Sequence, residues 1–349
     1  MGWSRAAALS TYCEVARRVG LDPDKMLQRA GIDPQILRFP EVRIGSQAVG
    51  RLLEESAVES HCPAFGVLMA EARPISGLGP LTLLLAHQRT LREALQAFVR
   101  YDHLLNGSLL LNFEEHQDVA LLRMQIDTPF AFPHRQSIEL AVTVVVRALV
   151  SLGGAAWRPE SVHFLHRAPP DLAVHRRVIA TALEFESSFC GLTYPQVALD
   201  SVNPDADPRI GAYARDYLDS LMPEGELESI EEQVRGILYG LLPRGLGTID
   251  QVAGQLGCST RTLQRLLDRE KLTFSEVLHD VRRAAVLRYL NIPGQSMSSI
   301  AEMLGYGSLS SFTRWFAAEF GMAPTSWRNE YAMRDLPRSP APLPVALSH

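Results

Sequence analysis

The chain is poor in cysteine. Its 349 residues include only Cys13, Cys62, Cys190 and Cys258, and no two of them form a CxxC pair. This spacing offers neither a zinc ribbon nor a thioredoxin-like redox site, so we expect free thiols in a reducing compartment. We therefore expect no bound metal and no cofactor.

Long apolar runs and enzyme motifs are also scarce. The longest apolar candidate, 141–146, ends at Arg147, well short of the roughly 18 residues of a membrane helix. The N-terminus shows charged residues around a short Ala-rich segment rather than the apolar region of a signal peptide. No G-x-S-x-G, P-loop or G-x-G-x-x-G motif occurs. We expect a cytoplasmic protein with no catalytic residues and no membrane partner.

No part of the chain has a strong excess of positive charge. Hydrophobic residues make up 46% and charged residues 21%, as in ordinary globular proteins, and the net charge is −5. The first 247 residues carry 23 Lys and Arg against 30 Asp and Glu, whereas residues 248–335 carry 10 against 9. A polyanionic partner would therefore have to bind a local patch, and we expect that patch in the less acidic last third.

The first two hundred residues indicate an α+β domain. Short apolar runs at 108–113 and 118–126 predict a hairpin, and helices are expected over 134–152 and 171–183. Strands and helices come in blocks rather than in strict alternation. We divide the chain into an α+β domain (1–205), an Asp- and Pro-containing acidic linker (206–228), an all-α domain (229–332) and a disordered tail (333–349).

Two segments of the last third resemble each other. Each has an Ala four residues before a Gly, followed by a Ser-led segment with an apolar face and an Arg. The residues are Ala253, Gly257, Ser259 and Arg265 in the first segment, and Ala301, Gly305, Ser308 and Arg314 in the second. A small residue where helices cross, a Gly that ends one helix and a Ser that caps the next are the requirements of a helix-turn-helix.

The second helix of each unit would bury apolar residues and expose polar ones. Those expected to point inward are Leu263 and Leu266 in the first unit, and Phe312 and Phe316 in the second. In the major groove Arg can bond guanine and Gln can bond adenine, while helix N-termini hold phosphates. A helix predicted over 274–290 joins the units and could place them about 34 Å apart, one turn of DNA. The pair indicates a DNA-binding domain.

Residues 229–332 resemble the DNA-binding domain of the AraC/XylS family of bacterial transcription regulators. The matching residues are Ile249, Val252-Ala253, Leu256-Gly257, Ser259, Arg261, Leu263, Arg265, Arg282, Ala285, Tyr289-Leu290, Ile300-Ala301, Gly305-Tyr306, Ser311-Phe312, Arg314, Phe316, Phe320-Gly321, Pro324 and Arg328. The resemblance implies seven helices and two helix-turn-helix units joined by a linking helix.

The same resemblance implies which residues contact DNA. They are Ser259, Thr260, Arg261, Gln264 and Arg265 in the first unit, and Ser308, Leu309, Ser310, Ser311 and Arg314 in the second. The second set has small Ser and apolar Leu where larger polar side chains often stand in the family. We therefore expect the second unit mainly to hold phosphates, or to touch a thymine methyl through Leu309.

The N-terminal part resembles a group of this family whose effector domain is labelled arabinose-binding-like. The matching stretches are 77–80, 90–94, 100–101, 162–164, 169–170, Phe185 and 199–200. The resemblance implies a small-molecule effector, a homodimer, promoter DNA and, for activation, RNA polymerase as partners. The label does not identify the ligand, and the apolar sensor segments favour a fatty acid or another amphipathic metabolite.

His134 and Arg135 are one candidate effector site. They begin the predicted long helix after Phe130 and Phe132, and could hold an acidic effector at the edge of an apolar pocket. A helix cap and a solvated charge are the simpler interpretation of the same residues. The effector-binding residues therefore stay unknown at this point.

His163 and His166 lie three apart in a predicted strand, where they would face opposite sides, so we expect no metal site there.

The sequence favours an effector-controlled transcription regulator, more often an activator than a repressor. One alternative is a constitutive DNA-binding protein whose N-terminal domain only dimerises. Another is an enzyme with a helical accessory domain, but no cysteine lies in a nucleophile motif.

Overall fold

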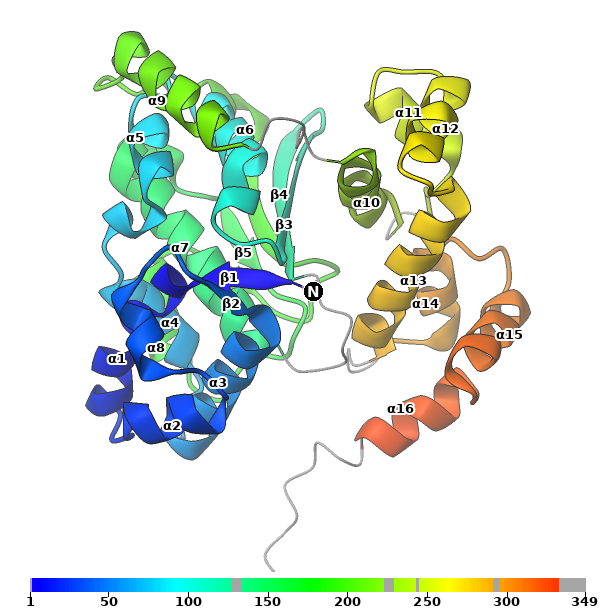
Figure 1. Ribbon diagram of the computed structural model, residues 1–349, viewed down its shortest axis with the longest axis horizontal. Helices are drawn as coiled ribbons and strands as arrows, with labels where there is room; N and C mark the ends of the chain where they lie inside the picture. Colours follow the sequence, from blue (N-terminus) through cyan, green and yellow to red (C-terminus); the bar gives the residue numbers. More distant parts are fainter. Residues whose placement is uncertain (1, 127–133, 223–228, 243–244, 291–294, 333–349) are drawn as a thin grey trace, which may run out of the picture.

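The computed structural model describes residues 2–126, 134–222, 229–242, 245–290 and 295–332, which form two units (Figure 1). The first unit combines a sheet with helices and the second is helical, so the expected α+β and all-α classes are confirmed. The expected tail, 333–349, and residues 223–228 of the expected linker lie outside the described residues.

A five-stranded sheet organises the first unit in the order β3-β4-β7-β5-β6. Its strands are β3 (Leu109–Glu115), β4 (Val119–Ile126), β5 (Ser161–His163), β6 (Ala182–Glu184) and β7 (Gly191–Pro195). β3 and β4 pair antiparallel, which confirms the predicted hairpin. The helix predicted over 171–183 is wrong at its end, because α8 stops at Ile179 and Leu183 lies in β6.

Helices and a small second sheet complete this unit. The helices are α1 (Tyr12–Arg18), α2 (Pro23–Arg29), α3 (Ser46–Glu59), α4 (Phe65–Ala72), α5 (Pro80–Ala86), α6 (Leu91–Tyr101), α7 (Arg135–Gly153), α8 (Ala173–Ile179) and α9 (Pro208–Leu221). β1 (Trp3–Arg5) pairs antiparallel with β2 (Arg43–Gly45). The short 3-10 helix η3 (Ile75–Leu78) precedes α5.

Two hydrophobic cores meet at α7. The sheet core includes Phe98, Leu111, Leu122, Val145 and Leu192, and the helical core includes Tyr12, Leu27, Leu53, Phe65 and Leu140. The segment 135–157 contains an 18-residue window with a mean hydropathy of 1.8 and reaches the length of a membrane helix, contrary to our expectation of no such run. Because α7 packs against α3, α4 and β4, it has the surroundings of a core helix.

Seven helices form the second unit within the described residues, as the resemblance implies. They are α10 (Ile230–Leu241), α11 (Ile249–Gln255), α12 (Thr260–Arg269), α13 (Phe274–Leu290), α14 (Met297–Met303), α15 (Leu309–Phe320) and α16 (Pro324–Ala332). α13 has the bounds predicted for the linking helix. Val281 of α13 belongs to a cluster with α10–α12, the upstream cluster, and Val286 to one with α14–α16, the downstream cluster. One helix thus carries both units.

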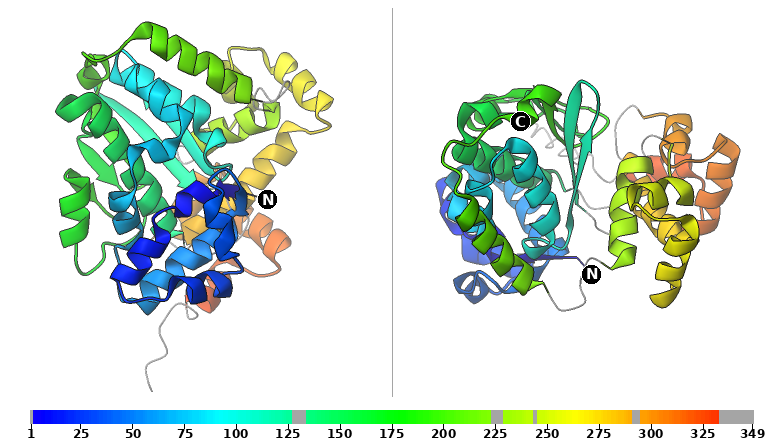
Figure 2. Two further views of the ribbon diagram at one scale, coloured as in Figure 1. Left: turned by 60° about the vertical axis from the view of Figure 1, so that its left-hand side comes forward. Right: turned by 90° about the horizontal axis from the view of Figure 1, so that it is seen from above.

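The two parts of the chain touch where β3 meets α10. The hairpin stands between the helices of the first unit and α10 in Figure 1 and in the right-hand view of Figure 2. Leu110 of β3 packs against the upstream cluster. A Cβ on Gly240 would lie 2.0 Å from Nδ2 of Asn112, so the lack of a side chain at Gly240 permits this close approach.

Residues 208–221, inside the segment expected as linker, form α9. This helix packs on α5 and buries Ala214 and Leu218 in the sheet core. The carboxylate of Asp219 accepts hydrogen bonds from the hydroxyl of Tyr101 (2.7 Å) and the guanidinium of Arg100 (3.1 Å). α9 is therefore anchored to the first unit.

Candidate DNA-binding interface

The first turn, between α11 and α12, has the hydrogen bonds of a Schellman motif. The amide of Cys258 donates to the carbonyl of Ala253 (3.0 Å), and the amide of Gly257 to the carbonyl three residues earlier (3.2 Å). Gly257 has a φ of 64°, the left-handed conformation expected for it. The Ser259 hydroxyl then accepts the Thr262 amide at 3.2 Å and caps α12.

The second turn repeats this geometry. The amide of Tyr306 donates to the carbonyl of Ala301 (2.9 Å), and Gly305, with a φ of 70°, donates to the carbonyl three residues earlier (2.8 Å). The Ser308 hydroxyl accepts the Ser311 amide at 3.2 Å. The second turn is one residue longer than the first, and the additional residue, Gly307, lies between Tyr306 and Ser308. Both predicted helix-turn-helix geometries are present.

The second helix of each unit packs on one apolar face. Leu263 of α12, and Phe312 and Phe316 of α15, are fully buried as predicted. The prediction for Leu266 is wrong, because it is only partly buried while Leu267 is 1% exposed. Residues four apart follow the helical repeat more closely than residues three apart, so Leu267 lies nearer the centre of the face that Leu263 begins.

The predicted DNA-contacting residues lie on the outward faces of these two helices and at their caps. The exposed ones are Ser259, Arg261, Gln264, Arg265, Ser308, Leu309, Ser310 and Arg314, and the partly buried ones are Thr260 and Ser311. Within the part of the chain that the structure describes, Arg261, Arg265 and Arg314 form no ion pair. Their charges are available to an anionic partner.

The two faces differ in what they can offer to DNA. In α15 the Ser308 hydroxyl lies 2.9 Å from that of Ser311, and the Thr313 hydroxyl donates to the carbonyl of Leu309 (2.9 Å). These short side chains are engaged within their own helix, while the side chain of Leu309 is 43% exposed. The long polar side chains are concentrated on α12, and α15 offers mainly Arg314.

Comparisons with known proteins agree with this pair of units. Residues 20–202 match the family described as the arabinose-binding domain of the AraC transcription regulator, N-terminal, and residues 252–330 match a helix-turn-helix domain. This chain belongs to the AraC family of transcription regulators. The HTH-type transcriptional regulator VirS of Mycobacterium tuberculosis is 30% identical over 326 residues, which cover 93% of this chain and 96% of VirS.

Two further proteins are similar to this AraC-family regulator along most of its length. The ornithine utilization regulator of Pseudomonas aeruginosa is 23% identical over 316 residues, covering 90% of this chain and 93% of that protein. The crystal structure of the transcriptional regulator CdpR from Pseudomonas aeruginosa aligns with a TM-score of 0.41 and 20% identity, over 88% of this chain and 96% of that chain. The matched families are those of a DNA-binding regulator, not of an enzyme.

Arg282 has a structural role that sequence reasoning did not assign. From α13 its Nε donates to the carbonyl of Leu304 (2.8 Å) and its Nη2 to that of Gly305 (3.2 Å), and its guanidinium lies 4.6 Å from the ring centre of Tyr306. It thus satisfies carbonyls at the C-terminus of α14, where the helix dipole favours a cation. Burial lowers the pKa of Arg282. The only signal in the sequence was its place in the family pattern.

Arg328 connects α16 to the C-terminal end of α13. From α16 its Nε donates to the carbonyl of Leu290 (3.1 Å) and its Nη1 to that of Gln295 (2.6 Å). Burial lowers the pKa of this arginine too. Arg282 and Arg328 together position α14 and α16 against α13, and so orient α15.

The histidines of the first unit are held by separate partners. Nε2 of His163 lies 2.8 Å from the Ser161 hydroxyl, whereas Nε2 of His166 lies 3.3 Å from the carboxylate of Glu139. The argument from strand alternation was wrong, because β5 ends at His163. Among the described residues no three His, Cys, Asp or Glu side chains could hold a metal ion.

His134 and Arg135, which the sequence offered as one candidate effector site, have different surroundings in the first unit. Arg135 donates to the carboxylate of Glu139 (3.0 Å) and to the carbonyl of Pro63 (2.8 Å), so its guanidinium has a structural role. His134 lines a cavity of the first unit. Phe130 and Phe132, which we grouped with them, lie outside the described residues.

Proposed function

We propose that this regulator binds promoter DNA sequence-specifically, with α12 reading bases and α15 chiefly holding phosphates. Two capped turns of matching geometry, each followed by a helix with an exposed arginine, carry the proposal. Arg261, Gln264 and Arg265 suit guanine and adenine edges in the major groove, while Arg314 and the capped N-terminus of α15 suit phosphate.

Variants of single arginines test this division of roles. On a bound DNA site, Arg265→Ala should cost about 1–3 kcal/mol and relax specificity at one position. Arg314→Ala should weaken binding to all sequences alike and lower the salt slope by about one. Arg269→Ala is the matched control, because it removes an exposed charge from the last turn of α12. A loss equal to that of Arg265→Ala would show that only total charge matters.

A small-molecule effector in the first unit controls DNA binding in this proposal. The contact of β3 with α10 gives a physical path between the units. An effector shifts an equilibrium between two arrangements only if it binds them unequally. Activation would follow from contact with RNA polymerase at promoters in the cytoplasm, as is usual for the family.

The proposed homodimer would form through α9. Ile210, Tyr213, Tyr217 and Leu221 are 38–70% exposed and follow one face of this helix. An exposed apolar face of this kind marks an interaction surface. Tyr217→Glu should convert a dimer to a monomer in sedimentation, and Arg209→Glu, at a charged position on the same helix, should not. A monomeric wild type would contradict the dimer.

A regulator that binds DNA constitutively, without an effector, is the second candidate function. It is favoured by the packing of α9 on α5, because this contact holds part of the segment expected as linker against the first unit. The two candidates differ in how DNA affinity responds to metabolites. If fractions of a cell extract raise the melting temperature of the protein and change its DNA affinity, the effector model holds. If no fraction changes either quantity, the constitutive model replaces it.

A further inference from the structure

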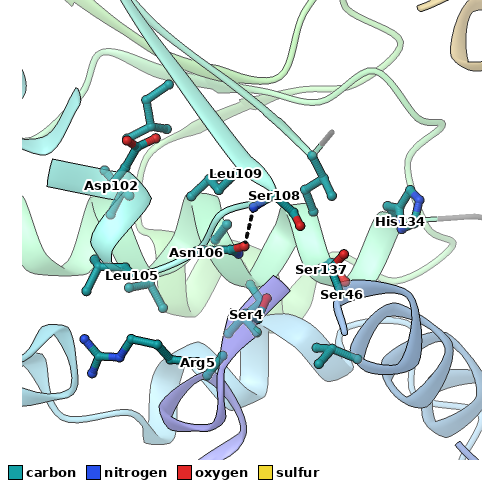
Figure 3. Close-up of a pocket in the computed structure, with 18 of the residues that line it drawn as sticks. Ser4, Arg5, Ser46, Asp102, Leu105, Asn106, Ser108, Leu109, His134 and Ser137 are labelled. Atoms are coloured by element: carbon teal, nitrogen blue, oxygen red, sulfur yellow. Dashed lines mark hydrogen bonds between the residues drawn. The ribbon is translucent and has the colours of Figure 1, made fainter. Parts of the chain in front are cut away.

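A cavity of about 100 Å³ lies between the two cores of the first unit (Figure 3). The helical core contributes Val49 and Leu53 to its lining, and the sheet core contributes Leu111 and Val145. Most of the lining residues are apolar. At about 10–15 Å³ for each water, this volume holds several waters or one small organic molecule.

Two arginines line the same cavity from either side of the turn at residues 77–79. Arg73 donates to the carbonyl of Gly77 at 2.8 Å, and a Cβ on Gly79 would lie 3.4 Å from Nη1 of Arg5. Arg5 is 8% exposed, and the Nε atoms of both arginines are buried with no hydrogen-bond partner in the described structure. Burial and the charge of Arg5 lower the pKa of Arg73 to about 10, so Arg73 remains cationic at neutral pH.

The carboxylates nearby do not balance this charge within the cavity. Glu41 lies 3.2 Å from Arg5, but its side chain is 76% exposed and is not part of the lining, so water screens the pair. Asp102 does line the cavity, and Figure 3 shows its carboxyl group separated from the Arg5 guanidinium by Leu105. The lining thus has two arginines against one carboxyl group.

We propose that this cavity binds the carboxylate of a small amphipathic metabolite, with Arg73 and Arg5 facing the carboxylate and the apolar lining facing the rest of the molecule. The inference rests on the proposed function, because it names the chemical class of its effector. Guanidinium groups bind carboxylates with paired, charge-assisted hydrogen bonds. Ser108 adds a buried hydroxyl without a partner in the described structure. A sugar carries several hydroxyls, and those that do not reach Ser108 or the arginines would lie against apolar side chains.

Binding of simple probes to the full chain tests the charge requirement. Butanoate, hexanoate, octanoate, decanoate and benzoate would be compared with octanol and octylamine by calorimetry and by thermal unfolding. We expect at least one carboxylate to bind about tenfold or more tightly than the alcohol, the scale of one to two charged hydrogen bonds. Arg73→Met should remove this preference. The control Arg177→Met, which removes a largely exposed arginine paired with Glu71, should keep it.

A second variant keeps the test decisive if Arg73→Met does not fold. Ala141→Phe adds a ring to the apolar lining and should abolish binding of every probe. Equal affinity for octanol and octanoate would overturn the proposal, as would binding of only sugars or polar amino acids, or no binding by any carboxylate.

DNA affinity measured in the same samples separates this inference from the proposed function. If carboxylates bind as expected and DNA affinity does not change, the cavity assignment stands and effector control fails. If another compound controls DNA binding equally in wild type and Arg73→Met, the proposed function stands and the cavity assignment fails.

Discussion

Leu110 and Leu111 are consecutive residues of β3 that serve different parts of the molecule. Leu111 lines the cavity of the first unit, and Leu110 packs against the upstream cluster of the second. Successive side chains of a strand point to opposite faces, so one strand contacts both. A ligand that displaces Leu111 would therefore move Leu110 and the surface on which α10 rests.

Leu110→Ala should uncouple the two units. The variant removes a contact with the upstream cluster but leaves the cavity and the recognition helices intact. We expect ligand affinity and ligand-free DNA affinity to change by less than about twofold, while the ligand-induced change in DNA affinity falls several-fold. Calorimetry and DNA titration with and without ligand measure this. Leu121→Ala, on the neighbouring strand and outside the upstream cluster, should retain full coupling.

Gly305→Ala should destabilise the second helix-turn-helix. Gly305 has a φ of 70°, and an added Cβ would also lie 3.3 Å from Nη2 of Arg282. We expect a cost of about 1–2 kcal/mol in urea unfolding, because L-residues are disfavoured in the left-handed region. Gly307→Ala is the control: its Cβ would meet nothing within 4 Å and its φ is not positive. An equal cost for both variants would contradict this account of the turn.

Arg282→Met should weaken DNA contact by the second unit alone. It leaves the carbonyls of Leu304 and Gly305 without their donor, at a cost of about 1–3 kcal/mol. Arg283→Met removes a charge from the same helix, but Arg283 is 58% exposed and pairs with Glu319, so its cost should stay within about 1 kcal/mol. Chemical unfolding and footprinting of each variant measure the two effects. A footprint lost from both halves of the site would show that Arg282 does not act locally.

Glu54 should make stability fall as the pH rises. Burial, opposed by a hydrogen bond from the amide of Gln136 and assisted by the charge of Glu139, raises its pKa from 4.5 to about 7. The folded state therefore binds the proton of the Glu54 carboxyl group more tightly than the unfolded state does. Its stabilising contribution is complete below pH 4.5 and is lost as the pH passes through 7.

Glu54→Gln should remove this dependence. The variant should gain on the order of 1–3 kcal/mol relative to wild type at pH 8 and little at pH 5, measured by urea unfolding. Glu59→Gln, at an exposed ion pair with Arg29, is the control and should show no such difference between the two pH values. If Glu54→Gln is equally stable relative to wild type at both pH values, Glu54 is ionised in the folded state throughout.

The helix-turn-helix turns were predictable because their determinants are local. Gly257 and Gly305 supply the left-handed residue, and Ser259 and Ser308 supply the caps, all within a few positions of each other. The end of α8 gave no such signal. It is closed by Ala180, which has a φ of 52°, although Ala is the strongest helix former.

The cavity and the contact between the units depend on residues distant in sequence. Arg5 and Arg73 meet only because β1 packs beside the turn that follows α4, and Gly240 lies against Asn112 only in the folded chain. The sequence around Arg5, Arg73, Gly240 and Asn112 contains no local pattern that indicates these contacts. The apolar sensor segments predict an amphipathic ligand, which stays a prediction, and they do not indicate the arginines proposed to hold its carboxylate.

Selection from random DNA tests the central claim most directly. Wild type, Arg265→Ala and Arg314→Ala would be compared in parallel at one salt concentration. We predict that wild type enriches a motif read by α12, that Arg265→Ala relaxes this motif at one position, and that Arg314→Ala weakens enrichment without changing the motif. Wild type that enriches no motif, both alone and with cell extract present, would contradict sequence-specific reading by α12.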